Sequence, residues 1–175
     1  MKNTEKSNQC STSARDWMKE ALVVAGQASI DLPVGCVIVK DGKVIAAAHN
    51  RREVDKDPVG HAEILAIREA ARVLDSWRLD GCTLFTTLEP CPMCAEAIIQ
   101  ARIAALYYGA YDLKSGACGS AFNLFKKGRI YPVPDVIGGI EEEECQRILT
   151  RYFEANVRAH PNQNLSQHPL PPDES

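Results

Sequence analysis

Two short segments constrain the fold of this chain most, because their side chains suit a single site although thirty positions separate His61 from Cys91. The first segment is His61-Ala62-Glu63, and the second is Pro90-Cys91-Pro92-Met93-Cys94. One imidazole and two thiolates are ligands that zinc prefers, and three protein ligands leave one coordination position open for water. The pattern therefore predicts a fold that brings both segments together around a catalytic zinc ion.

The spacing within each segment also suits zinc. Cys91 and Cys94 are three residues apart at a predicted helix start, so their side chains share one face. The helix N-terminus lowers thiol pKa values and favours thiolates, and His61 can supply a neutral ring nitrogen as the third ligand. Zinc held in this way lowers the pKa of its water to about 7. Glu63 can reach that water without binding the metal, which predicts a proton shuttle.

Two other interpretations of the cysteine pair were weighed against catalytic zinc. A Cys-x-x-Cys motif also occurs in thioredoxin-like redox proteins, but a redox pair needs neither His61 nor Glu63. A structural zinc site needs a fourth ligand. Cys82 and Cys118 are available for that role, although neither stands at a ligand-like spacing. We therefore favour the catalytic interpretation.

Length and composition limit the other classes of protein. A chain of 175 residues fits one domain with a hydrophobic core. No run of about eighteen apolar residues occurs, so no membrane span is expected, and the polar N-terminus lacks the apolar region of a secretory signal. The net charge of −3 argues against a surface dominated by polyanion binding. Seven cysteines without an export signal indicate reduced thiols and a cytoplasmic location.

Hydrophobic periodicity predicts alternating strands and helices. Two apolar runs flank Lys40-Asp41-Gly42-Lys43, and Asp-Gly between such runs predicts a β-hairpin. The expected strands span 34–39, 44–48, 82–87, 103–108 and about 135–137. The expected helices span 14–29, 61–74, 91–100, about 121–125 and 141–155.

This order of elements predicts an α/β layered domain over residues 13–157. The strands are continuous apolar runs, which suits a sheet covered by helices on both faces. Right-handed crossovers would place helices 61–74 and 91–100 on one face, with both N-termini at the carboxyl ends of the strands. The polar residues 1–12 and the tail 158–175, which is rich in Pro, Asn and Gln, are expected to be disordered.

From about Trp17 to Ala155 the sequence resembles the cytidine deaminase-like superfamily, and within it the bacterial tRNA adenosine deaminases. That resemblance implies a three-layer α/β/α sandwich with a mixed five-stranded sheet, and a homodimer with active sites near the subunit interface. It also implies hydrolytic conversion of adenosine to inosine at the wobble position of the tRNA anticodon loop. The segments that carry the resemblance are 32–39, 49–51, 57–58, 61–64, 87–95, 108–110, 112, 114–117 and 119–120.

The same resemblance implies one zinc ion per chain, no organic cofactor, and roles for individual residues. Glu63 is expected to move protons, and Asn50 to hydrogen-bond the substrate base or its sugar. An Asn side chain offers a donor and an acceptor together, which suits a base edge, although a turn-forming Asn explains the residue equally well. The resemblance further implies three substrate-binding residues, namely Ala62, Pro90 and Ser120.

Departures from the family leave the substrate open. Residues 128–134 lack the Asn-His pair common in tRNA deaminases, and the last helix lacks a strong basic cluster. A free-base or nucleoside deaminase acting on guanine, cytosine or a related heterocycle is the alternative. Two basic clusters suit either phosphate contacts or solvated loops. These clusters consist of Arg51, Arg52 and Lys56, and of Lys126, Lys127 and Arg129.

Overall fold

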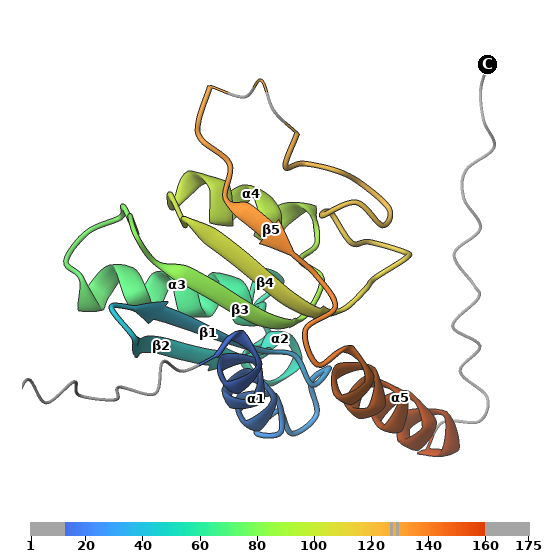
Figure 1. The fold of residues 1–175 in the computed structure, drawn as a ribbon. Helices are drawn as coiled ribbons and strands as arrows, with labels where there is room; N and C mark the ends of the chain where they lie inside the picture. Colours follow the sequence, from blue (N-terminus) through green and yellow to red (C-terminus); the bar gives the residue numbers. More distant parts are fainter. Residues whose placement is uncertain (1–12, 127, 129, 160–175) are drawn as a thin grey trace, which may run out of the picture.

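The computed structural model describes residues 13–126, 128 and 130–159, and it shows a five-stranded sheet between layers of helices (Figure 1). Strand β1 runs antiparallel to both of its neighbours, β2 and β3, whereas β4 is parallel to β3 and β5 is parallel to β4. The predicted mixed five-stranded sheet is therefore confirmed. In spatial order the strands are β2 (Lys43–His49), β1 (Gly35–Lys40), β3 (Thr83–Leu88), β4 (Ala105–Ala110) and β5 (Asp135–Ile137).

Helices cover both faces of this sheet because successive strand residues point to opposite sides. On one face Ile38 packs in a buried cluster with residues of α3 (Ala62–Val73) and α4 (Pro92–Gln100). On the other face Val37 packs with residues of α1 (Ala14–Ala25) and α5 (Glu142–Ala159). Figure 1 shows the two pairs of helices on opposite sides of the sheet. This arrangement is the predicted three-layer α/β/α sandwich.

The directions of the strands bring the two segments with candidate zinc ligands, 61–63 and 90–94, to the same end of the sheet. Since β1 is antiparallel to both neighbours, β2 and β3 point the same way. The chain leaves β2 toward α3 and leaves β3 toward α4, and these two helices contact each other on the same face. Both helix N-termini therefore lie at the carboxyl ends of parallel strands, where open α/β sheets bind ligands.

The predicted hairpin between β1 and β2 is present. Asp41 and Gly42 both adopt positive φ angles, of 50° and 69°, as a two-residue turn of this kind requires. At the other end of β1, Gly35 allows α1 to approach, because a Cβ atom there would lie 2.1 Å from the carbonyl oxygen of Ala21. The N-terminal end of β1, which lies beside the C-terminal end of β3, is thus packed directly against the backbone of α1.

One predicted element is wrong, and its location matters for the site. Residues 121–125 form no helix; instead Cys118 and Asn123 make an isolated antiparallel bridge. The amide N–H groups of Ala121 and Phe122 both donate to the carbonyl of Gly116, which closes a tight turn. Gly119 adopts a φ of 137° within it. Backbone groups committed to these turn contacts cannot join a helical ladder.

Other boundaries differ more modestly. The short helix α2 (Arg52–Asp55) was not predicted, and α5 continues to Ala159, past its predicted end and into the expected tail. The expected disorder of residues 1–12 and 160–175 concerns positions outside the described residues. None of the helices in the described part of the chain is long and apolar enough to span a membrane.

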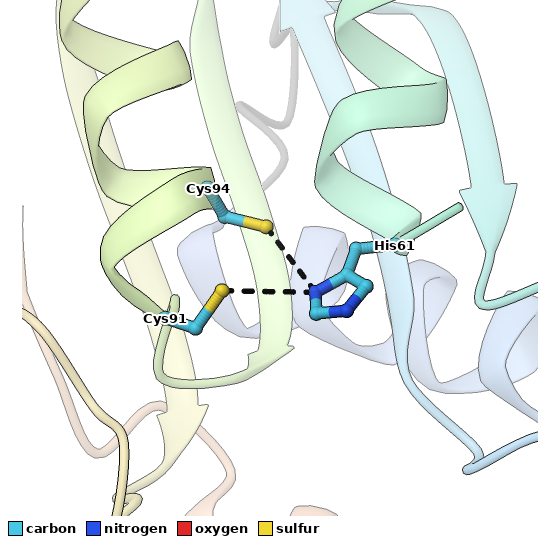
Figure 2. Close-up of side chains that lie close together, drawn as sticks. All are labelled: His61, Cys91 and Cys94. Carbon is cyan, nitrogen blue, oxygen red and sulfur yellow. Dashed lines mark hydrogen bonds between the residues drawn. The ribbon is translucent and has the colours of Figure 1, made fainter. Parts of the chain in front are cut away.

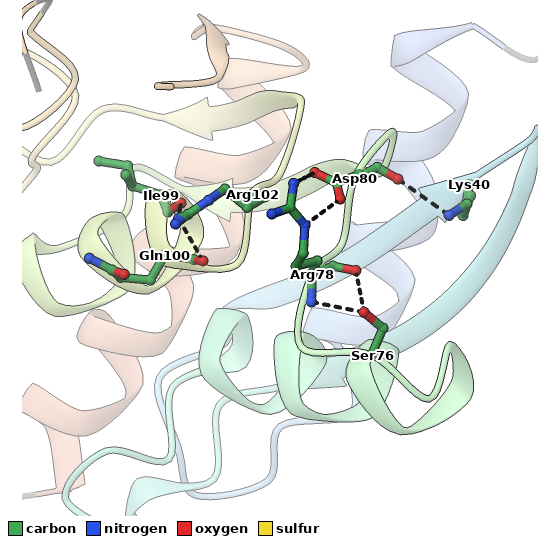
Figure 3. A network of polar contacts seen from close by, with 7 residues as sticks. All are labelled: Lys40, Ser76, Arg78, Asp80, Ile99, Gln100 and Arg102. Carbon is green, nitrogen blue, oxygen red and sulfur yellow. Dashed lines mark hydrogen bonds and ion pairs between the residues drawn. The ribbon is translucent and has the colours of Figure 1, made fainter. Parts of the chain in front are cut away.

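Figure 3 shows polar contacts among loops at the other end of the sheet, away from the segments 61–63 and 90–94. The guanidinium of Arg78 pairs with the carboxylate of Asp80, with 2.8 Å between Nε and Oδ2, and Lys40 donates to the Asp80 carbonyl. Arg102 donates to the carbonyls of Ile99 and Gln100 at the end of α4. Lys40 thus links the end of β1 to the connection that enters β3, whereas the contacts of Arg78 and Arg102 lie within the connections that enter β3 and β4.

Candidate metal centre and active site

Three candidate ligands converge where α3 and α4 begin (Figure 2). His61 is the N-cap residue of α3, Cys91 is the N-cap residue of α4, and Cys94 lies in the first turn of α4. Pro92 occupies the first helical position, where a missing amide hydrogen costs little. The Nδ1 atom of His61 lies 3.7 Å from the Cys91 sulfur and 3.5 Å from the Cys94 sulfur.

These separations fit zinc. A zinc ion bonds sulfur at about 2.3 Å and imidazole nitrogen at about 2.1 Å, and tetrahedral geometry then places the two ligand atoms about 3.6 Å apart. The ligand-type atoms of all three residues lie within 4.8 Å of one another, and no fourth residue of ligand type joins them in the described part of the chain. The arrangement could hold a zinc ion with one open position.

The two thiols differ in acidity. A hydrogen bond from the Cys94 thiol, aided by the His61 ring, lowers the pKa of Cys91 to about 4, although partial burial opposes the shift. The same bond to Cys91, together with burial, raises the pKa of Cys94. A hydrogen bond with Cys91 raises the pKa of His61. Cys91 is therefore the more acidic of the two thiols, and a bound divalent cation would favour the thiolate form of both.

Glu63 lies in the first turn of α3 and is only 4% exposed. Burial raises the pKa of its carboxyl group, while the nearby His61 ring opposes that shift. The carboxyl group lines the same cavity as His61 and Cys91 but does not belong to the cluster of ligand-type atoms. A carboxyl group at this place can exchange protons with a water held at the metal site.

A cavity of about 290 Å³ opens beside these groups. Asn50 borders it as predicted, and its side-chain oxygen is buried without a hydrogen-bond partner. A buried acceptor without a donor reduces the stability of the fold, unless a bound ligand donates a hydrogen bond to it. Residues that line the cavity include Asp31, Leu32, Val34, Asn50, Arg52, Glu53, His61, Ala62, Glu63, Leu88, Glu89, Cys91, Asp112, Ser115 and Tyr152.

The remaining predicted substrate-binding residues are placed unequally. Ala62, the first residue of α3, is buried and lines the cavity. Pro90 and Ser120 are not among the lining residues: the Pro90 carbonyl accepts a hydrogen bond from Ala117, and Ser120 donates to Glu89. Their binding of substrate stays a prediction.

The first basic cluster does not act as a unit. Arg51 pairs through two hydrogen bonds with Asp55 on α2, whereas Arg52 is exposed and lines the cavity. In the second cluster Lys126 is exposed, and positions 127 and 129 lie outside the described residues. Of the cationic side chains in the first cluster, Arg52 is thus the one placed at the cavity.

Asp31 and Tyr152 are two of the cavity residues that the sequence did not indicate. The buried carboxylate of Asp31 accepts hydrogen bonds from the amides of Glu53, at 2.7 Å, and Val54, at 3.2 Å, and so caps α2 from a distant segment. Tyr152 of α5 lines the cavity, and its hydroxyl donates to the carbonyl of Ile30. Neither residue belongs to a sequence motif that could have predicted its place at the cavity.

Glu89 precedes Pro90, but it is not an exposed charge at a helix N-terminus. Its side chain is 2% exposed and accepts hydrogen bonds from the amides of Asp112 and Cys118. The carboxylate of Glu89 therefore holds the loop that contains these two residues next to the segment 90–94, which carries two of the candidate metal ligands.

The fold and the site together define a zinc-dependent deaminase. The family model for the cytidine and deoxycytidylate deaminase zinc-binding region matches residues 11–110, and the chain belongs to this family.

Within the family the chain is similar to tRNA-specific adenosine deaminases. It is 43% identical to the enzyme of that name from Bacillus subtilis over 139 residues, which cover 78% of this chain and 86% of the relative. A solved structure from a study of A-to-I editing by tRNA:A34 deaminases matches with a TM-score of 0.73 and 46% identity, covering 76% of this chain and 98% of that one. Guanine deaminase from Bacillus subtilis matches with a TM-score of 0.55 and 34% identity, covering 67% and 87% of the two chains.

Proposed function

We propose that this protein is a hydrolytic deaminase that converts adenosine to inosine at the wobble position of a tRNA anticodon. The observation that carries the proposal is one cavity bordered by a zinc-type ligand set, a buried carboxyl group and an unpaired amide oxygen. Its occurrence in a chain 43% identical to a tRNA-specific adenosine deaminase supports this substrate. In the reaction, water replaces the amino group on C6 of adenine, and ammonia leaves.

We assign one zinc ion per chain to the ligands His61, Cys91 and Cys94. Zinc so bound supplies Lewis acidity, which lowers the pKa of a water at the open position to about 7. Two thiolates and a neutral imidazole would hold the ion where α3 and α4 begin, beside the cavity that His61 and Cys91 line. Their placement on two helix starts keeps the ligand set rigid relative to the sheet.

Glu63 carries the protons. Its carboxylate takes a proton from the attacking water and delivers it to the ring nitrogen beside C6. It then takes the proton of the new hydroxyl group on C6 and delivers it to the amino group, which leaves as ammonia while the C6 carbonyl forms. The burial of Glu63 excludes bulk water, so the proton passes between the carboxyl group and the substrate.

Asn50 orients the base. Its unpaired side-chain oxygen accepts a hydrogen bond from the substrate, and its amide group can donate one. Ala62 leaves space for the base at the cavity wall. A cavity of about 290 Å³ lies at the small end of ligand sites, so it admits one base while the rest of an anticodon loop stays outside. The adenosine must therefore be splayed out of the loop.

A free-base deaminase is the second candidate, and the match to guanine deaminase at 34% identity favours it. The two functions are separated by incubating the enzyme with an anticodon stem-loop and, in parallel, with free guanine, cytosine, adenosine and cytidine. We expect inosine in the stem-loop and no ammonia from the free compounds. A stem-loop with guanosine at the wobble position is the matched control. Ammonia from a free base alone would overturn the tRNA assignment.

We further propose a cytoplasmic homodimer, as the family resemblance implies. The cysteines of the described residues are free thiols, which agrees with a reducing compartment. Multi-angle light scattering should give about twice the chain mass of 19.2 kDa. A mass of one chain at micromolar concentration would contradict the dimer and leave the deaminase assignment intact.

A further inference from the structure

Glu89 is a buried acid that the proposed chemistry does not use. It follows β3 directly and precedes Pro90, so it stands at the junction between the sheet and the metal-binding helix α4. Its side chain is 2% exposed. A carboxylate at such depth needs several donors to offset the loss of water.

Those donors come from one loop. Carboxylate oxygen Oε2 accepts from the amide of Asp112, at 3.0 Å, and from the hydroxyl of Ser120. Oxygen Oε1 accepts from the amides of Cys118, at 2.9 Å, and Ser120, at 3.2 Å. The start and the end of the segment 112–120, which we call the anchored loop, thus converge on a single carboxylate.

The anchored loop is shaped to enclose this acid. A Cβ atom at Gly116 would lie 2.4 Å from the carboxyl carbon of Glu89, so only glycine lets the loop backbone approach this closely. Next to it, the amide of Ala117 donates to the carbonyl of Pro90 at 2.8 Å. Both contacts bind the loop to the residues just before Cys91.

The loop so placed forms a wall of the substrate cavity. Asp112 and Ser115 line the catalytic cavity and also line an adjoining cavity of about 380 Å³. Asp112 is held internally, since its carboxylate accepts from the amides of Lys114 and Ser115. The adjoining cavity is bordered by further apolar side chains, including Tyr111, Leu113, Leu149 and Phe153.

We propose that Glu89 is a positioning residue for substrate binding: it holds the anchored loop against the metal helix and so sets the wall between the two cavities. Glu89 also borders the catalytic cavity, but the hydrogen bonds that its carboxylate accepts in the described part of the chain come from the anchored loop, and none comes from a candidate metal ligand or from Glu63. Its loss should therefore act on substrate affinity. The kinetic part of this proposal rests on the proposed deaminase function.

The test compares the full-length zinc enzyme with Glu89→Gln, which keeps the shape but replaces one acceptor oxygen by a donor. We expect unchanged zinc content, a rise in KM for the anticodon stem-loop of at least about tenfold, and a kcat within about threefold of the parent. Hydrogen exchange of the amides in 112–120 should accelerate by at least about tenfold. The matched control, Glu144→Gln, removes an exposed carboxylate that pairs with Arg147, and it should change none of these values.

Ser120→Ala provides a second variant that removes only the hydroxyl donor, and it should accelerate exchange in the same segment by a smaller factor. It decides the exchange test if Glu89→Gln does not fold. Unchanged exchange, loss of zinc, or a lower kcat at constant KM would each contradict the proposal. If the parent enzyme does not act on the stem-loop, the proposed tRNA function fails, whereas exchange and KM for the base that it does deaminate still decide the role of Glu89.

Discussion

Glu63→Gln should retain about one zinc ion per chain and lose at least about a thousandfold in kcat, because an amide cannot take up the proton of the attacking water. The side chain keeps its size, so the cavity that it shares with Asn50 and His61 should keep its shape. Inosine formation in the stem-loop measures kcat, and elemental analysis measures zinc. Glu63→Ala should behave in the same way.

The control for this variant lies on the same helix. Glu69 is exposed and pairs with Arg72, so Glu69→Gln loses the same charge from α3 without touching the cavity. It should keep the parental kcat. Activity of Glu63→Gln near the parental level would refute the assigned proton transfer, and loss of its zinc would show that Glu63 supports the metal instead.

Cys91→Ser should lose both zinc and activity. Only His61 and Cys94 would remain from the ligand set, and a serine hydroxyl is a poor substitute for a thiolate. Zinc content should fall below about 0.1 per chain after dialysis. Since a ligand present at about a thousand times its Kd stabilises a fold by about 4 kcal/mol, the free energy of unfolding should fall by a similar amount. Thermal unfolding with and without a chelator measures this loss.

The variant Cys118→Ser distinguishes a catalytic zinc site with three protein ligands from a structural zinc site with four. Cys118 was considered as a fourth ligand, but its sulfur lies outside the cluster formed by the three candidates. Its amide, which the substitution leaves in place, makes the contact with Glu89. We expect parental zinc content and activity. Loss of zinc in this variant would favour a closed four-ligand site and contradict the open position on which the proposed reaction depends.

Much of the layered fold was predictable because local signals agreed with it. Asp41 and Gly42 marked the hairpin, and the apolar runs marked strands that are buried on both faces. The wrong helix at 121–125 has a different cause. Its residues show a helical pattern, but the turn around Gly119 and the bond from Ala121 to the Gly116 carbonyl commit the backbone elsewhere. Tertiary contacts outweigh weak local propensity in such a segment.

By itself, the sequence predicted the candidate zinc ligands, because ligand type and helical spacing can be seen in two short segments that contain His61, Cys91 and Cys94. The structure alone decided what surrounds these residues. Asp31 caps residues 22 positions away, Ser120 reaches Glu89 across 31 positions, and Tyr152 meets Ile30 across 122 positions. Contacts at such separations depend on how the layers pack, and no local pattern encodes them. The wall of the cavity therefore depends on tertiary structure, whereas the candidate metal site can be predicted from two short segments.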